Sequence, residues 1–326
     1  MTSCAWVTHE PQPLFLAGPT AVGKSAVALA FAPKRRGEII SVDSMQVYRG
    51  LRIGTAKPSD AELQQVPHHL LDIADLGESY SAGRFVLEAS RAAQEIQRRK
   101  RVPILCGGSG LYFQALLEGL GDASPSDPLV RQELERHSLA KLLEELERCD
   151  PEQFRTVDRA NRRRVVRALE VARTAVATAS ARPARWIRRG GLNLRGQNPV
   201  QPICFVALRR AKEDLHERIS RRVERMFAAG LVAETQMLLR AALPLTHGAW
   251  QAIGYKQVLE HLQKKYSLDE TIERVKQRTR QFAKRQMTWF NRQTDLRWFE
   301  LAPDEPDQAV ASRLVAWYDQ HTRSES

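Results

Sequence analysis

The sequence has few cysteines and lacks any long apolar run. Its four cysteines, Cys4, Cys106, Cys149 and Cys204, form no Cys-x-x-Cys pair, which argues against a zinc site. Cys106 and Cys204 belong to apolar runs and are predicted to be small core residues. No stretch approaches about 18 consecutive apolar residues, so no membrane-spanning helix is expected.

The N-terminal residues also lack the pattern of a secretion signal. Residues 1–13 have no basic start followed by an apolar stretch, and the apolar run at 14–17 is too short for a signal core. Free cysteines are typical of a reducing compartment. Together these features predict a cytoplasmic protein that does not contact a membrane.

Acidic residues are outnumbered by basic ones. Lys and Arg total 50 against 38 Asp and Glu, a formal net charge of +12. An excess of this size favours a polyanionic partner such as nucleic acid, although a basic protein with no such partner remains the alternative.

In the first part of the chain, short apolar runs alternate with helical patterns. Each apolar run ends in a polar or glycine-rich turn, and Ser81 is placed to cap the helix that follows it. This alternation predicts a parallel sheet with helices on both faces. The predicted strands are 13–17, 38–42 and 102–106, and the predicted helices are 26–31 and 83–99.

A different pattern begins after residue 126. Residues 127–173 have helical periodicity with interleaved acids and bases, whereas 176–200 are poor in large apolar residues and predict a mobile connection. Further on, strands are predicted at 203–208 and 296–301 and helices at 212–228, 231–241, 250–264, 268–293 and 307–318. The predicted division is an α/β core at 1–126 and 201–326 and an inserted all-helical domain at 127–200.

The first predicted strand runs into a complete phosphate-loop motif. Its residues are Gly18-Pro19-Thr20-Ala21-Val22-Gly23-Lys24-Ser25. A preceding strand and a following helix are the context that this motif requires. Glycines let backbone N–H groups surround phosphate oxygens, and the helix N-terminus adds positive charge. Lys24 would neutralise diphosphate oxygens and Ser25 would offer its hydroxyl to Mg²⁺. The motif predicts a P-loop NTPase-like core with a bound polyphosphate of unspecified identity.

Two further predicted strands deliver polar groups to the same edge of the sheet. The second strand ends at Asp43, and the third ends in a turn that contains Gly107, Gly108, Ser109 and Gly110. Ligands of open parallel sheets bind beyond the carboxyl ends of the strands. Asp43 could hold Mg²⁺, accept a proton from a nucleophile or cap a helix that begins at Ser44, and the residue type alone does not separate these roles.

Basic residues gather in two helical segments. One segment contains Arg159, Arg162, Arg163, Arg164 and Arg167. In the other, near the end of the chain, Arg278, Arg285 and Arg292 recur every seven residues, and Trp289 falls on the same helical face. Cations next to an aromatic ring suit a single-stranded RNA loop. The alternative is a solvated helix face with Trp289 in the core.

Blocks along nearly the whole chain follow the order found in one family. Besides the phosphate loop they are Ser41-Val42-Asp43-Ser44-Met45-Gln46-Val47-Tyr48, Gly54-Thr55-Ala56-Lys57-Pro58, Val66-Pro67-His68-His69-Leu70, Tyr80-Ser81-Ala82-Gly83, Gly107-Gly108-Ser109-Gly110-Leu111-Tyr112, Arg164-Val165-Val166-Arg167-Ala168-Leu169-Glu170, Ile253-Gly254-Tyr255-Lys256 and Ala283-Lys284-Arg285-Gln286-Met287-Thr288-Trp289-Phe290. With these blocks the chain resembles the tRNA dimethylallyltransferases, also called tRNA isopentenyltransferases.

The resemblance implies a prenyl transfer. Dimethylallyl diphosphate would lie in the phosphate loop with Mg²⁺, and the exocyclic amine of adenosine 37 in a tRNA anticodon loop would attack its allylic carbon. By position, Asp43 resembles the family's general base and Ser109 a residue that contacts the diphosphate and the transferred group. Arg218 resembles an arginine on the diphosphate, and Lys24 acts with it. A monomeric enzyme is expected.

The resemblance also implies the tRNA contacts. They are Asp43, Ser44, Met45, Gln46, Ser109, Arg131, Arg163, Arg164, Val165, Val166, Arg167, Gln251, Ala252, Ile253, Gly254, Tyr255, Lys256, Lys284, Arg285, Gln286, Met287, Thr288, Trp289, Phe290 and Asn291. Two other functions share the phosphate loop: an ATP-binding kinase that acts on RNA or a metabolite, and a nucleotide-dependent RNA-binding protein without transfer chemistry.

Overall fold

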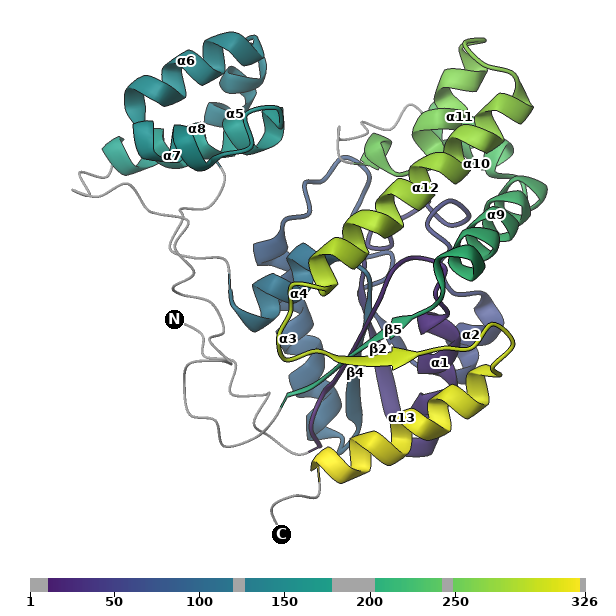
Figure 1. Ribbon diagram of the computed structural model, residues 1–326. Coiled ribbons are helices and arrows are strands. Elements are labelled where there is room, and N and C mark those ends of the chain that lie inside the picture. Colours follow the sequence, from purple (N-terminus) through teal and green to yellow (C-terminus); the bar gives the residue numbers. More distant parts are fainter. Residues whose placement is uncertain (1–10, 120–126, 178–202, 242–248, 323–326) are drawn as a thin grey trace. The chain divides into compact units, whose positions relative to one another are not determined.

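The computed structural model describes residues 11–119, 127–177, 203–241 and 249–322 (Figure 1). The chain divides into two compact units, Met1–Phe113 with Pro199–Ser326, and Gln114–Asn198. The boundaries of the inserted domain expected at 127 and 200 stay a prediction. Apart from its first two residues, the connection expected to be mobile, 176–200, lies outside the described residues.

A six-stranded parallel sheet forms the centre of the first unit. The strand order is β3-β2-β4-β1-β5-β6, which confirms the parallel α/β core. The predicted strands are all present, with ends shifted by one residue. The two-residue β3 is too short to leave a sequence pattern. The strands are β1 (Leu14–Ala17), β2 (Gly37–Val42), β3 (His68–His69), β4 (Val102–Gly107), β5 (Cys204–Arg209) and β6 (Arg297–Glu300).

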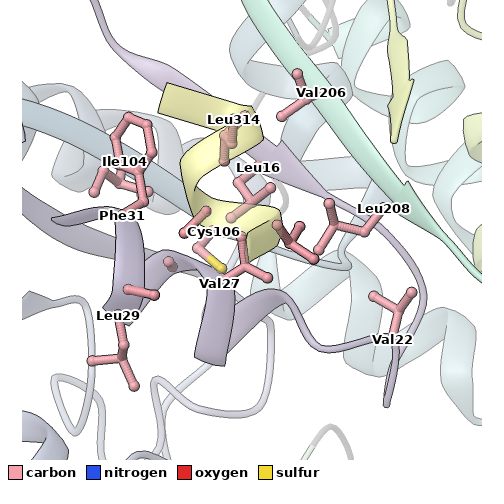
Figure 2. Packing of buried hydrophobic residues seen from close by; sticks show 14 of the residues in the cluster. Leu16, Val22, Val27, Leu29, Phe31, Ile104, Cys106, Val206, Leu208 and Leu314 are labelled. Atoms are coloured by element: carbon pink, nitrogen blue, oxygen red, sulfur yellow. The ribbon is translucent and has the colours of Figure 1, made fainter. Parts of the chain in front are cut away.

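One face of the sheet packs against α1 (Lys24–Phe31) and α13 (Asp307–Thr322), which lie side by side (Figure 1). Alternate residues of the central strands point toward these helices because successive side chains of a strand face opposite ways. Figure 2 shows Leu16, Ile104 and Val206 among the side chains of α1 and Leu314 of α13. These side chains are buried, and Cys106 and Cys204 belong to the same cluster, as predicted.

The opposite face is lined by aromatic rings. Phe15 of β1 and Phe205 of β5 meet edge to face with ring centroids 6.1 Å apart. Phe113 of α4 (Gly110–Leu117) packs on Phe205 at 5.5 Å and on Phe290 of α12 (Leu268–Phe290) at 6.1 Å. Helices therefore cover both faces, as the sequence predicts.

Most of the remaining helices of this unit lie where the sequence predicts them, but no helix was predicted at Asp60–Gln65 and one predicted helix is interrupted. A single helix expected at 250–264 is wrong: Gly254 adopts a φ of 101°, which interrupts the helical backbone. Ser81 caps its helix by accepting a hydrogen bond from the Arg84 N–H, as predicted. These elements are α2 (Asp60–Gln65), α3 (Ala82–Arg98), α9 (Lys212–Ala228), α10 (Leu231–Arg240), α11 (Tyr255–Leu262) and the 3₁₀ turns η2 (Ala32–Arg35) and η3 (Ala249–Gln251).

The second unit is helical in its described part. Leu134, Leu142, Leu146 and Leu169 are fully buried in its own apolar core. Across the described residues of the chain, no helix is both long and apolar enough to cross a membrane. The helices of the second unit are α5 (Pro128–Glu135), α6 (Leu139–Cys149), α7 (Pro151–Thr156) and α8 (Arg162–Ala177).

Candidate active site

The strand register brings three loops to one level of the sheet. Gly107 of β4 pairs with Ala17 of β1 on one side and with Val42 of β2 on the other. The next residue of each strand leaves the sheet at the same height, so the phosphate loop, Asp43 and the turn at Gly108 start together. The Ser109 N–H also donates to the carbonyl of Val42 at 3.2 Å. The predicted meeting of these loops is thus a direct result of the register.

The phosphate loop follows a path that favours glycine. Gly18 has a φ of 143°, and a Cβ at this position would lie 2.8 Å from the carbonyl oxygen of Leu208. Gly23 has a φ of 111° and immediately precedes α1. A side chain at Gly18 would collide with the neighbouring strand, so the close turn depends on this glycine.

Three cationic side chains hold carbonyl oxygens of the loop. Arg210 is the most deeply buried of them, with a side chain only 1% exposed. Because each carbonyl already has a donor, the loop is fixed by the protein itself. The pairs are Lys24 Nζ with Pro19 O at 2.7 Å, Arg218 Nε with Ala21 O at 3.1 Å and Arg210 Nε with Val22 O at 2.9 Å.

Burial disfavours the charged form of two cations beside the phosphate loop, Lys24 and Arg222. It lowers the pKa of Lys24 to about 8, a shift that the carboxylate of Asp43 partly opposes. The pKa of Arg222 is also lowered by burial, and Asp43 again opposes the change. The electrostatic interactions among these groups therefore join Lys24, Arg222 and Asp43 beside the phosphate loop. A bound diphosphate would favour the charged form of Lys24 and would offset the cost of burying the Arg222 guanidinium, which stays charged.

Arg222 is a candidate site residue that the sequence reasoning missed. It follows Arg218 by four residues on α9, so both side chains leave the same helical face. Arg218 donates to the loop backbone. For Arg222, by contrast, no hydrogen bond or ion pair is found within the described residues. The i, i+4 spacing was the signal available in the sequence.

Asp43 caps a turn. Its Oδ1 accepts hydrogen bonds from the N–H groups of Met45, at 2.8 Å, and Gln46, at 3.3 Å. No helix begins at Ser44, so the helix-cap alternative is wrong in that form. In the described part of the chain, Oδ2 has no hydrogen-bond partner. One oxygen thus orients the half-buried carboxylate, and the other is available to a ligand.

Ser25 is the residue that could hold a metal ion. It is exposed in the first turn of α1, directly after Lys24. The described residues contain no group of three His, Cys, Asp or Glu side chains suited to a metal. One hydroxyl beside a phosphate loop fits Mg²⁺, which is commonly bound by one or two protein oxygens together with substrate phosphates.

Helix α12 lies beside the phosphate loop with one side buried and the other exposed to solvent. Gln286 is only 7% exposed and contacts both the phosphate loop and the turn at Gly108. Trp289 is half-buried, and a Cβ at Gly110 would lie 2.6 Å from its ring, so the indole packs directly on that glycine. Neither alternative from the sequence describes Trp289 completely, because it packs on the protein and also remains partly exposed.

The predicted tRNA contacts divide by burial. The side chains that can meet a macromolecule directly are the exposed ones. In the first unit the exposed members are Gln251, Lys256, Lys284, Arg285, Thr288 and Asn291, the half-buried ones are Asp43, Ser44, Met45, Gln46, Ser109, Ile253, Met287 and Trp289, and the buried ones are Ala252, Gly254, Tyr255, Gln286 and Phe290. Arg278 and Arg292 are exposed as well, so the basic stripe of α12 faces solvent.

Basic residues of the second unit divide in the same way. Arg163 and Arg164 are exposed near the start of α8, whereas Val165 and Val166 are in the core. Arg131 pairs with Glu135 at 3.3 Å, and Arg167 pairs with the buried Glu170 at 3.1 Å. The exposed arginines leave an accessible positive surface on this unit.

Comparison with known proteins decides the family. A family model described as "IPP transferase" matches residues 46–293. The chain belongs to the IPP transferase family. The phosphate loop and Asp43 precede the matched range, but relatives extend over nearly the whole chain. A protein of Trichlorobacter lovleyi named tRNA dimethylallyltransferase 1 is 44% identical, covering 89% of this chain and 93% of its own. A tRNA dimethylallyltransferase of Xanthomonas oryzae is 43% identical, covering 95% of both.

Solved structures of similar proteins share the fold. The full-length tRNA isopentenylpyrophosphate transferase of Bacillus halodurans aligns with a TM-score of 0.66 and 33% identity, covering 96% of this chain and 98% of its own. A eukaryotic dimethylallyltransferase acting on tRNA aligns with a TM-score of 0.74 and 28% identity, covering 94% and 79%. The family and its α/β fold therefore agree with the resemblance found in the sequence.

Proposed function

We propose that this protein transfers a dimethylallyl group from dimethylallyl diphosphate to N6 of adenosine 37 in tRNA, giving N6-dimethylallyladenosine and diphosphate. The observation that carries the proposal is the meeting of a complete phosphate loop with an oriented carboxylate, Asp43, at one level of the sheet. Membership of the IPP transferase family gives this pair its chemistry.

The donor diphosphate would lie against the phosphate loop. Lys24 and Arg222 offer positive charge there, and Arg218 and Arg210 hold the loop backbone. Stabilising the departing charge is the main requirement for breaking an allylic C–O bond, so preorganised cations supply electrostatic catalysis. When bound through Ser25 and the diphosphate oxygens, Mg²⁺ would add positive charge to the leaving group.

Asp43 would act on the acceptor. As adenosine N6 forms its bond to the allylic carbon, the bond from that carbon to the diphosphate oxygen breaks and its electron pair leaves with diphosphate. The amine then carries a surplus proton, which Oδ2 of Asp43 can accept while Oδ1 stays bound to the turn. A position close to Lys24 keeps this carboxylate near the reacting atoms.

The RNA would lie across the exposed side of α12. Arg285 and Arg292 can pair with phosphates, and the half-buried Trp289 can stack on a base through the exposed part of its ring. Adenosine 37 must leave its stack to reach Asp43, which costs little in a single-stranded anticodon loop. We propose that the protein acts in this way as a cytoplasmic monomer and that the exposed arginines of α8 also contact tRNA.

A labelling experiment separates this function from a kinase. The protein is mixed with unmodified anticodon stem-loop RNA and either dimethylallyl diphosphate labelled in its prenyl group or ATP labelled in its γ-phosphate. Prenyl label should enter the RNA, and an RNA with guanosine at position 37 should stay unlabelled. Transfer from ATP would instead support the kinase. Binding of RNA without either label entering it would support the RNA-binding alternative.

A further inference from the structure

One amide side chain connects the two loops that border the donor site. The Thr20 N–H of the phosphate loop donates to Gln286 Oε1 at 2.9 Å, and Gln286 Nε2 donates to the Gly108 carbonyl at 2.8 Å. The partners fix the orientation of the amide, because a flip would place a donor against a donor and an acceptor against an acceptor. Gln286 thus bridges residues that are 266 and 178 positions away in sequence.

Packing leaves the amide little freedom. Gln286 is 7% exposed, and a Cβ at Gly108 would lie 2.3 Å from Nε2. The glycine is therefore what allows the amide to approach the turn. The Gln286 side chain is too deeply buried to contact RNA directly, whereas its neighbour Arg285 on α12 is exposed.

We propose that Gln286 is a positioning residue for the donor: it sets the spacing between the phosphate loop and the turn at Gly108, and thereby the shape of the diphosphate site. This inference rests on the proposed function, in which the two loops hold dimethylallyl diphosphate. It differs from the tRNA contact that the resemblance implies for this residue. The role is indirect, because Gln286 acts through the Thr20 N–H and the Gly108 carbonyl.

Gln286→Met tests the bridge while keeping the length of the side chain. The dissociation constant for inorganic diphosphate, measured by calorimetry without RNA, should rise about tenfold, because a phosphate loop no longer tied to the turn at Gly108 must be ordered as the anion binds. The donor KM should rise by a similar factor, with the KM for anticodon stem-loop RNA changing less than about twofold. Gln277→Met, the same substitution at an exposed position of α12, is the matched control and should behave like the parent.

A second variant approaches the bridge from its other end. Gly108→Ala should push the amide away and weaken diphosphate binding about as much as Gln286→Met, since its Cβ would collide with Nε2. Adding Gln286→Ala should relieve that collision and leave only a 3.2 Å contact between the new Cβ and the Gly18 carbonyl oxygen, so the double variant should bind diphosphate nearly as well as Gln286→Ala alone. This non-additive result depends on the contact itself, and Gly108→Ala gives a readout even where Gln286→Met unfolds.

Three outcomes would overturn the inference: unchanged diphosphate affinity in a folded Gln286→Met protein, an effect on RNA KM alone, or additive effects of the Gly108 and Gln286 substitutions. Diphosphate titration keeps the proposed function separate. If the parent binds diphosphate but transfers no prenyl group to RNA, the proposed function fails while the positioning role is still measured. If Gln286→Met lowers diphosphate affinity and the parent transfers prenyl groups, both stand.

Discussion

Tyr255 and Glu234 form a buried hydrogen bond that joins α11 to α10, and both side chains also reach the loop before α2. The Gly54 N–H donates to the Tyr255 hydroxyl at 3.1 Å, and the Ile53 N–H donates to the Glu234 carboxylate at 3.1 Å. A buried carboxylate is stable here because the hydroxyl and the backbone N–H groups satisfy it. The predicted tRNA segment at 251–256 is thus anchored from within.

Tyr255→Phe should destabilise the fold. Removing the hydroxyl leaves the Gly54 N–H without its acceptor and takes one of three donors from Glu234 Oε1, at a cost of about 1–3 kcal/mol. Urea denaturation would show the loss as a lower midpoint at similar m-value. Tyr266→Phe is the control, because that ring is half-buried under Arg274 and its hydroxyl makes no hydrogen bond within the described residues. Equal midpoints for the two variants would contradict this account.

Asp43→Asn separates the roles left open for that residue. The amide keeps the size of the side chain but cannot take the proton of N6, so single-turnover transfer should fall by about 10²–10⁴-fold. Donor affinity in the presence of Mg²⁺ should stay near the parent value, because Lys24, Ser25 and Arg222 remain. A parallel loss of donor affinity and of its Mg²⁺ dependence would assign Asp43 to the metal instead.

Lys24 should bind a proton when the donor binds. Its pKa of about 8 means that the ammonium is partly neutral in mildly alkaline solution, whereas a bound diphosphate favours the charged form. Calorimetry at about pH 9 in buffers of different ionisation enthalpy should therefore detect proton uptake. Lys24→Arg stays charged and corrects for protons exchanged by the ligand. Identical uptake by both proteins would show that Lys24 does not titrate in this range.

The same shift sets the direction of a stability change. Between pH 8 and the ordinary value of 10.5, the unfolded chain keeps a proton that folded Lys24 has lost. Because stability rises with pH wherever the unfolded state binds more protons, the contribution of Lys24 to the free energy of unfolding should increase across this interval. Comparison of urea midpoints with those of Lys24→Met across the interval measures that contribution.

Replacing Arg222 should reduce kcat/KM more than replacing Arg218. Arg222→Ala removes a cation that we place directly on the departing diphosphate, so kcat/KM should fall by about 10²–10³-fold. Arg218→Ala removes a hydrogen bond to the Ala21 carbonyl and should cost only about tenfold, mainly through donor KM. The reverse order would assign the diphosphate to Arg218, as the family resemblance implies.

The basic stripe of α12 should contribute to RNA affinity through phosphates. Arg285→Ala and Arg292→Ala should each weaken stem-loop binding and reduce the slope of log K against log salt by about one. Donor binding should not change. Arg313→Ala on α13, where the exposed arginine pairs with Glu305, is the control and should keep the parent slope. A parent-like slope in the α12 variants would leave the stripe as a solvated helix face.

Local patterns in the sequence predict most of the fold. Each central strand is a short apolar run, and the cap at Ser81 and the phosphate loop depend on residues close together in the chain. The capping box of α2, in which Ser59 and Glu62 bond each other's backbone, is also a local pattern that indicates a helix start, although no helix was predicted there. Helix α4 has no clear amphipathic pattern because it packs among apolar neighbours.

Contacts between distant segments could not be predicted in this way. The partners of Gln286 lie in loops that the β1–β4 register brings together. Gln286 does follow the helical spacing of the buried side of α12, between Ala283 and Phe290, but that spacing does not show which backbone groups its amide contacts. Arg222 was missed for a related reason, since only the folded chain shows which of two arginines one helical turn apart bonds the loop backbone.

The carbonyl oxygens of Pro19, Ala21 and Val22 are already bonded by side chains of the same protein. A loop held in this way loses little conformational entropy when an anion binds. The binding free energy is therefore not reduced by the cost of ordering the loop. The donor should therefore associate without a slow rearrangement of the loop. Its on-rate would then depend on diffusion and on attraction by the protein's positive field, and should fall as ionic strength rises.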